Sequence, residues 1–164
     1  MSNGIQLDET SLAIVTALTQ DGRASYQAIA DEVGLSRPAV MERVKRLEEQ
    51  GVITGYTARL DRAKIGRPIT AFINVRYPSS SHVGTEPWIL ELEHHPDVLE
   101  CHHVAGDDCY ILKVAVSGVD KLQETLRALR PKGEPANTRT TIVLSTLFEK
   151  ANVLPEDAPV PAHG

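Results

Sequence analysis

The stretch formed by residues 34–50 constrains the fold most, because it predicts a short helix with one apolar face behind a turn. Gly34 ends any helix before it, and Ser36 can cap the next helix by accepting a hydrogen bond from a first-turn amide. Pro38 falls in that first turn, where its missing N–H costs little. The side chains that share one face, at spacings of four and three residues, are Val40, Val44 and Leu47.

The chain is acidic as a whole but basic along this helix. Its 164 residues carry a net charge of −5, which disfavours a protein that binds nucleic acid over its whole surface. Between residues 36 and 46, four cations oppose the single anion Glu42, so the local net charge is +3. Charges are screened beyond ~8 Å at physiological salt, so a DNA phosphate would sense this patch more than distant carboxylates. A basic helix behind a glycine turn is typical of major-groove readers.

Two further helices are expected before the basic one. Residues 7–20 predict the first, which Asp8 can cap, and residues 26–33 predict the second, which Ser25 can cap. The short turn Asp21-Gly22-Arg23 separates them. Three short helices with a glycine turn between the second and third predict a winged-helix-like helix-turn-helix. We therefore expect residues 1–52 to form a DNA-binding domain.

The patterning changes from helical to β-type after the third helix. Residues 52–60 are rich in β-formers and residues 61–68 end in turn residues, so we expect a β-linker at 53–68. Residues 69–150 follow the order β-α-β-β-α-β, which predicts a ferredoxin-like domain and makes the fold class α+β. The Pro- and Ala-rich tail at 151–164 is expected to be disordered.

The elements of the second domain follow from alternation and helical spacing. Strands are expected at 70–77, 98–104, 110–116 and 137–148, and helices at 87–95 and 119–130. Two helices would cover one face of the four-stranded sheet and leave the other open. An open apolar face usually marks an interface, so we expect two copies to pair face to face.

Several motifs match a known family in order and spacing. They are Asp-Gly-Arg-Ala-Ser at 21–25, Val-Gly-Leu-Ser at 33–36, Arg-Val-Lys-Arg-Leu-Glu at 43–48, Gly-Val-Ile-Thr-Gly-Tyr at 51–56, Gly-Asp at 106–107 before a Tyr-Ile-Leu-Lys-Val strand, and Asn-Thr-Arg-Thr at 137–140. With these motifs, residues 7–150 resemble the Lrp/AsnC (feast/famine) family of prokaryotic transcription regulators. The resemblance implies a homodimer that assembles to a higher even oligomer such as an octamer. It also implies an amino acid or related metabolite that binds between C-terminal domains and changes assembly or DNA affinity.

The basic helix supplies most of the candidate DNA-binding residues. Its first turn would enter the groove, with Arg37 placed to bond guanine O6 and N7 together, while later cations would contact phosphates. The second helix could touch a further phosphate. The full set is Arg23, Ser25, Ser36, Arg37, Pro38, Ala39, Arg43, Lys45 and Arg46. The alternative is a solvated face whose cations pair with Glu42, Glu48 and Glu49.

The turn Gly106-Asp107-Asp108 is the candidate effector site. Its amides could hold a carboxylate and an Asp could hold an α-ammonium group, or the turn could be an ordinary hairpin connection. The family usually has a second acid where this chain has Cys109. The full candidate set is Gly106, Asp107, Asp108, Cys109, Tyr110, Thr138, Arg139 and Thr140, the last three from a neighbouring strand or subunit.

Other classes of function find little support in the sequence. No acid–base pair, nucleophile or phosphate loop stands out, so no catalytic residue and no cofactor is expected. The spacing of His94, His95, His102 and His103 does not fit a metal site. No apolar run approaches the ~20 residues of a membrane helix, no secretion signal is evident, and the two cysteines form no disulfide framework.

We therefore expect a cytoplasmic, nucleoid-associated protein that binds double-stranded DNA. The leading hypothesis is a sequence-specific transcriptional regulator whose assembly or DNA affinity responds to an amino acid or related metabolite. The alternatives are a nucleoid-type architectural protein without an effector, and an enzyme built on the C-terminal domain.

Overall fold

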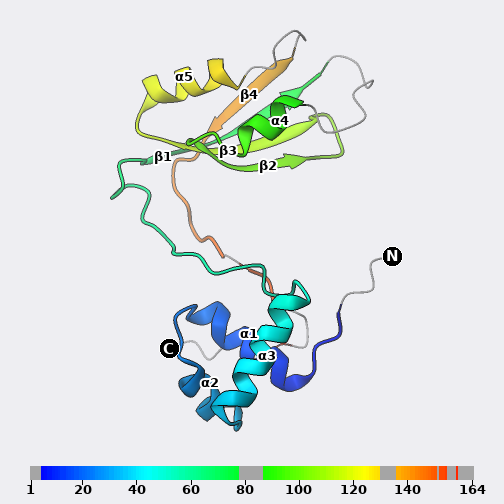
Figure 1. The fold of residues 1–164 in the computed structure, drawn as a ribbon. Helices are drawn as coiled ribbons and strands as arrows, with labels where there is room; N and C mark the ends of the chain where they lie inside the picture. The colour runs from blue at the N-terminus through cyan, green and yellow to red at the C-terminus, as the bar shows by residue number, and fades with distance from the viewer. Residues whose placement is uncertain (1–4, 78–86, 130–135, 151, 155–157, 159–164) are drawn as a thin grey trace. The chain divides into compact units, whose positions relative to one another are not determined.

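The chain folds into two compact units in the computed structural model, which describes residues 5–77, 87–129, 136–150, 152–154 and 158 (Figure 1). The N-terminal unit comprises residues 1–59 and 148–164, and the C-terminal unit comprises residues 60–147. The chain therefore crosses from one unit to the other twice. Residues 148–150, expected in the second domain, belong to the first unit.

Three helices build the N-terminal unit, namely α1 (Glu9–Gln20), α2 (Tyr26–Val33) and α3 (Arg37–Glu49). Each begins at a side chain that accepts a hydrogen bond from a backbone amide of the first turn, and these caps are Asp8, Ser25 and Ser36. Gly34 ends α2 with φ of 69°, a left-handed conformation that glycine adopts without strain. The three predicted helices and their caps are thus observed.

The three helices pack around one apolar core. From α3, the side chains of Val40, Val44 and Leu47 are buried, as their spacing predicts. They pack with buried residues of the other two helices, which are Ile14, Ala17, Ile29 and Ala30. One face of α3 is therefore fixed inside the unit, and three of the four cations on its other faces, Arg37, Lys45 and Arg46, are exposed to solvent.

The C-terminal unit is a four-stranded antiparallel sheet with two helices. Its elements in chain order are β1 (Ile69–Arg76), α4 (Pro87–Leu92), β2 (Val98–His103), β3 (Tyr110–Val116), α5 (Val119–Ala128) and β4 (Asn137–Ile142). The strand order is β2-β3-β1-β4, and every neighbouring pair is antiparallel. This confirms the α+β class and the predicted β-α-β-β-α-β order.

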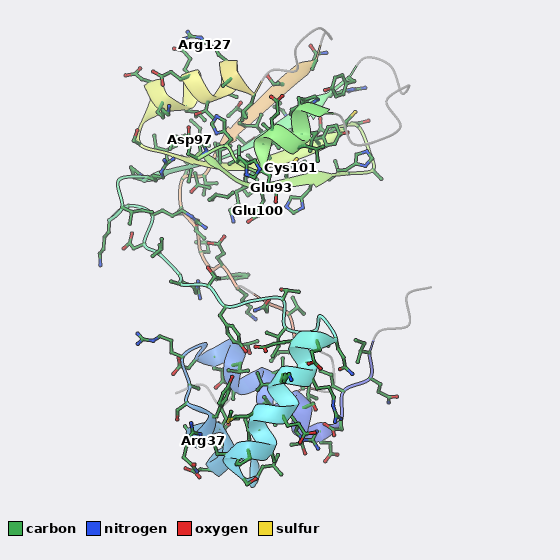
Figure 2. The ribbon with its side chains drawn as sticks, viewed as in Figure 1. Arg37, Glu93, Asp97, Glu100, Cys101 and Arg127 are labelled. Carbon is green, nitrogen blue, oxygen red and sulfur yellow. The ribbon has the colours of Figure 1, made fainter. Side chains whose placement is uncertain are left out.

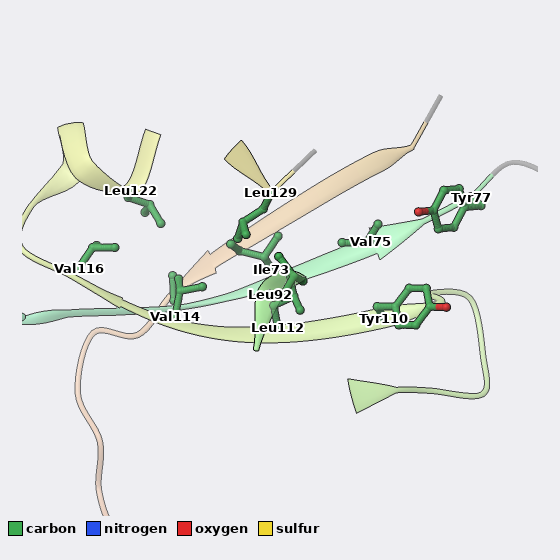
Figure 3. Close-up of a cluster of buried hydrophobic side chains, with 11 residues drawn as sticks. Ile73, Val75, Tyr77, Leu92, Tyr110, Leu112, Val114, Val116, Leu122 and Leu129 are labelled. Carbon is green, nitrogen blue, oxygen red and sulfur yellow. The ribbon is translucent and has the colours of Figure 1, made fainter. Parts of the chain in front are cut away.

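One face of this sheet holds the main core of the unit (Figure 3). Alternate residues of the two central strands point to it, including Ile73 and Val75 of β1 and Leu112 of β3. Leu92 from α4 and Leu122 and Leu129 from the α5 region pack on them. The two helices therefore cover the same face of the sheet, as the sequence predicts.

The connecting segments differ from the prediction of β structure. Residues 52–60 form no strand, and β4 ends at Ile142 rather than at residue 148. A strand needs a hydrogen-bonded neighbour, and within the described residues the last ladder-like bond runs from Val143 N to Thr70 O at 2.9 Å. The helix α4 is also shorter than expected, ending at Leu92. The prediction of a disordered tail falls mainly on residues outside the described ones.

The open face of the sheet is mixed rather than plainly apolar, which corrects the expectation. Phe72 is exposed on this face. Polar pairs surround it, because Lys113 Nζ lies 3.0 Å from Glu100 Oε1 and Arg139 Nη2 lies 3.1 Å from Asp108 Oδ2. A partner on this face would therefore need charged as well as apolar groups.

The packing of α3 predicts the effect of truncating one of its buried side chains. Leu47→Ala should lower the free energy of unfolding of the N-terminal unit by about 2–5 kcal/mol, since it leaves a cavity at a side chain only 2% exposed. Urea unfolding followed by far-ultraviolet circular dichroism measures the change. The matched control is Met41→Ala on the exposed side of α3, which should stay within about 0.5 kcal/mol. Equal losses for both variants would contradict the packing of α3.

Candidate DNA-binding surface and effector turn

The exposed face of α3 presents three of the four predicted cations to solvent. Arg37 is the first residue of the helix, and among the described residues its guanidinium has no ion-pair partner (Figure 2). Lys45 lies 3.6 Å from Glu49 and Arg46 lies 3.6 Å from Glu42, each pair one turn apart. Exposed pairs of this kind contribute at most about 1 kcal/mol, so a phosphate can replace the glutamate.

Arg43 lies on a different side of α3 and contacts α1. Its Nη1 donates to Asp8 Oδ2 at 2.7 Å and to Ser11 Oγ at 3.1 Å. Hydrogen bonds from Ser11 and Arg43 hold the pKa of Asp8 well below its usual range. Arg43 thus stabilises the start of α1, a role that its basic neighbourhood in the sequence did not indicate. Its partner lies 35 residues away, so only the tertiary packing reveals the pair.

The remaining predicted DNA-binding residues lie at the starts of α2 and α3. Ser25 Oγ accepts from Ala28 N at 3.1 Å, and Ser36 Oγ accepts from Ala39 N at 3.4 Å. Arg23 precedes α2 with an exposed side chain, while Pro38 is exposed in the first turn of α3. Two helix N-termini, each capped by serine and each beside an exposed arginine, are suited to contact with phosphate.

The predicted effector turn connects β2 to β3. Val104 N donates to Cys109 O at 3.0 Å, and Cys109 N donates to Val75 O at 2.8 Å, so the turn is tied to β1. Gly106 has φ of 139°, which favours glycine. Asp107 is exposed, and among the described residues its carboxylate has no hydrogen-bond or ion-pair partner.

The carboxylate of Asp108, in the turn, already has hydrogen-bond partners on two strands, β1 and β4. Its Oδ2 accepts hydrogen bonds from Asn74 Nδ2 of β1 and from Arg139 Nη2 of β4. Asn74 and Arg139 face each other directly across the β1–β4 ladder. Sequence analysis missed Asn74, although a lone amide in an otherwise apolar strand was a usable signal.

The side chains of four other predicted effector residues do not face the carboxylate of Asp108. Thr138 and Thr140 pair with Val75 and Ile73, so they point to the helix-covered face, opposite Arg139. Tyr110 is buried in that core, with its ring 5.1 Å from that of His103. Cys109 packs against the same core. Within one chain, therefore, the eight predicted residues do not line one pocket.

Two of the cavities lined by described residues lie in the N-terminal unit. The larger, about 290 Å³, is lined by α1 residues such as Leu18, by residues 52–56 and by residues 152–154. The smaller, about 180 Å³, lies between the start of α1 and α3, beside Asp8 and Arg43. In the described part of the chain no group of His, Cys, Asp and Glu side chains is arranged to hold a metal ion, and no helix is long and apolar enough to span a membrane.

Comparison with known proteins identifies both units. Residues 7–54 match the family model for winged helix-turn-helix DNA-binding domains, and residues 70–153 match that for Lrp/AsnC ligand-binding domains. This chain belongs to the Lrp/AsnC family of transcriptional regulators. Two known proteins illustrate the likeness in sequence. The regulator LrpA of Mycobacterium tuberculosis is 35% identical, over 91% of this chain and 97% of its own length, and the proline dehydrogenase transcriptional activator of Rhizobium radiobacter is 33% identical, over 87% and 92%.

Solved structures of Lrp/AsnC regulators share the folds of both units. The crystal structure of M. tuberculosis LrpA, 33% identical, superposes with a TM-score of 0.78 over 91% of this chain and 100% of that one. A feast or famine regulatory protein of M. tuberculosis complexed with L-methionine, 34% identical, gives 0.82 over 92% and 100%. The α+β fold with its helix-turn-helix is thus shown for this regulator.

The Arg43–Asp8 contact predicts a pH effect in this Lrp/AsnC regulator. A lowered pKa of Asp8 contributes stability above the carboxyl's unfolded pKa of about 4, and this contribution is lost as the pH falls further. Arg43→Gln should raise the pKa of Asp8 toward its usual value and flatten this acid dependence. Carbon-detected NMR titration of the Asp8 carboxyl measures the shift. Lys45→Gln, which loses only the exposed pair with Glu49, should leave Asp8 unchanged, and an unmoved Asp8 in Arg43→Gln would contradict the contact.

Proposed function

We propose that this Lrp/AsnC regulator binds double-stranded DNA sequence-specifically through α3, with Arg37 as a base-contacting residue. The observation that carries the proposal is the exposed guanidinium of Arg37 at the capped start of α3, without an ion pair among the described residues. Arginine can bond both acceptors of a guanine edge, which gives sequence preference. Lys45 and Arg46, loosely paired with glutamates on their own helix, would contact phosphates.

The regulator works as a homodimer or a higher even oligomer in this proposal. Support comes from the second crossing between the units, where Leu144, Leu147 and Phe148 are 98%, 91% and 80% exposed. These large apolar side chains are exposed and follow β4, an edge strand of the sheet. Both features favour an interface with another copy of the chain. A dimer would place two α3 helices in successive major grooves, about 34 Å apart.

An amino acid or related metabolite is the proposed effector, bound near the turn that contains Asp107. A related regulator is described as a complex with L-methionine, and residues 70–153 match the ligand-binding domain of the family. The exposed carboxylate of Asp107 can meet an α-ammonium group, and a second subunit would complete the pocket, since such sites favour interfaces. With these properties, the regulator acts on chromosomal DNA in the cytoplasm.

Replacing Arg37 tests sequence-specific binding. A duplex selected from randomised DNA by the wild-type protein serves as the probe. Arg37→Ala should weaken binding to it by about 1–3 kcal/mol and relax the preference at one base position. The control Lys45→Ala should weaken binding to selected and unselected DNA alike. An equal loss of affinity for all DNA sequences in Arg37→Ala, or protection spread evenly along the probe in footprinting, would instead favour an architectural protein.

A thermal-shift screen of the twenty amino acids tests the effector. A ligand at about 100 times its dissociation constant adds about 2.7 kcal/mol of stability, which gives a measurable upward shift. Asp107→Asn should abolish that shift, while Glu93→Gln, an exposed acid elsewhere in the same unit, should retain it. No shift with any amino acid would overturn amino-acid sensing and leave DNA binding untouched.

A further inference from the structure

Asp97 is a fully buried carboxylate that the proposed DNA and effector sites do not use. It lies directly before β2 in the C-terminal unit (Figure 2), and its side chain is 1% exposed. Its Oδ1 accepts a hydrogen bond from the guanidinium of Arg67, and its Oδ2 accepts one from Thr125 Oγ1 of α5 at 2.8 Å. Lys121 Nζ lies 3.9 Å from Oδ2. Burial alone would raise the pKa of Asp97, but the bonds from Arg67 and Thr125 outweigh it, so the carboxyl stays charged.

Arg67 brings the segment between the units into this cluster. It lies two residues before β1, and its Nη1 also donates to Ala115 O of β3 at 3.0 Å. One guanidinium therefore binds the connecting segment to β3 and to Asp97, the residue directly before β2. A buried charge is tolerated only with such partners, so the cluster holds Arg67 in one place.

The residues just before Arg67 are ordered by their own hydrogen bonds. Asp61 Oδ1 accepts from Ala63 N at 3.0 Å and from Lys64 N at 3.2 Å. Arg67 N donates to Arg62 O at 2.7 Å. Residues 54–60 are different, because no backbone–backbone hydrogen bond joins them to any other described residue. The division of the chain between residues 59 and 60 agrees with this contrast.

A second tie lies on the other side of that division. Arg59 Nη2 donates to Glu149 O at 2.9 Å, and both residues belong to the N-terminal unit. The hydrogen bond joins the last residue before the chain enters the C-terminal unit to a residue just after the chain leaves it. The stretch without backbone–backbone hydrogen bonds to other described residues is therefore limited to residues 54–60, and the side chain of Arg59 is tied near its end.

We propose that Arg67 and Asp97 are positioning residues that fix residues 61–67 to the C-terminal unit and so set the reach of the DNA-binding unit. This inference rests on the proposed function. Because residues 61–67 are fixed to the C-terminal unit, the two α3 helices of a dimer can bind only half-sites that have a restricted separation and a restricted rotation about the DNA axis. A freely jointed connection would tolerate a half-site turned to the opposite side of the duplex.

Half-site phasing provides the test with the full-length protein. The probe is the duplex selected by the wild-type protein, used unchanged or with about 5 or about 10 base pairs inserted at its centre, half a turn or one turn. The full-turn insertion adds about 34 Å of separation at the same phase, so it should also weaken binding by the wild-type protein. The wild-type protein should bind the half-turn insertion about tenfold more weakly than the unchanged probe. In Arg67→Ala this ratio should fall below about threefold, while affinity for the unchanged probe stays within about threefold.

Controls separate positioning from folding and from DNA binding itself. Asp97→Asn, which keeps the size of the side chain, should lose phasing like Arg67→Ala and covers the case in which that variant fails to fold. Lys64→Ala, an exposed cation of the same segment, should keep phasing. Hydrogen exchange should be faster at the backbone amides of residues 63 and 67 in Arg67→Ala and in Asp97→Asn, with β1 and β3 still protected.

The outcomes distinguish the two proposals. Failure of the wild-type protein to select any DNA would overturn the proposed function. Selection without a phasing ratio in the wild-type protein, or an unchanged ratio in both folded variants of Arg67 and Asp97, would overturn the positioning role and leave the proposed function standing.

Discussion

Burial of the apolar stripe on α3 is the constraint on which the N-terminal unit depends. Each side chain of the stripe, such as Val44 or Leu47, contributes about 1.5–3 kcal/mol when fully buried. The exposed ion pairs of the same helix contribute at most about 1 kcal/mol each. The stripe therefore decides the rotation of α3 about its axis, and the cations take the directions that remain. Arg37 thereby faces solvent and Arg43 faces α1.

The parts of the fold that local rules determine could be predicted from the sequence. Ser25 and Ser36 cap their helices because a short hydroxyl can reach an amide three residues on, which needs no knowledge of the rest of the chain. β3 runs from Tyr110 to Val116 as expected, because its alternate residues are apolar and its neighbours on both sides are strands. Comparison with relatives confirms the family that the motifs indicated.

The parts that depend on distant residues or on another chain could not be predicted. Arg43 and Asp8 lie 35 residues apart, and Arg67 and Asp97 lie 30 apart, so no local pattern joins them. The β-rich segments at 52–60 and 144–148 have strand composition, but among the described residues they have no neighbouring strand to pair with. The amino-acid composition of a segment indicates its β propensity. A strand forms only when a second strand is available for hydrogen bonding, and the composition does not reveal that.

Two carboxylates of the C-terminal unit, each bound by an arginine, differ in how easily a ligand could reach them. Asp97 is 1% exposed, and loss of Arg67 would leave its charge inside the protein, so this pair is suited to hold structure. Asp108 is 19% exposed and its partner Arg139 is 73% exposed, so solvent screens the pair and weakens it. Opening the pair of Asp108 and Arg139 would leave both groups partly exposed to solvent rather than as buried unpaired charges. Exposure, more than the presence of an ion pair, therefore distinguishes the two pairs, and it agrees with the proposal that a metabolite binds near the turn rather than at the buried cluster.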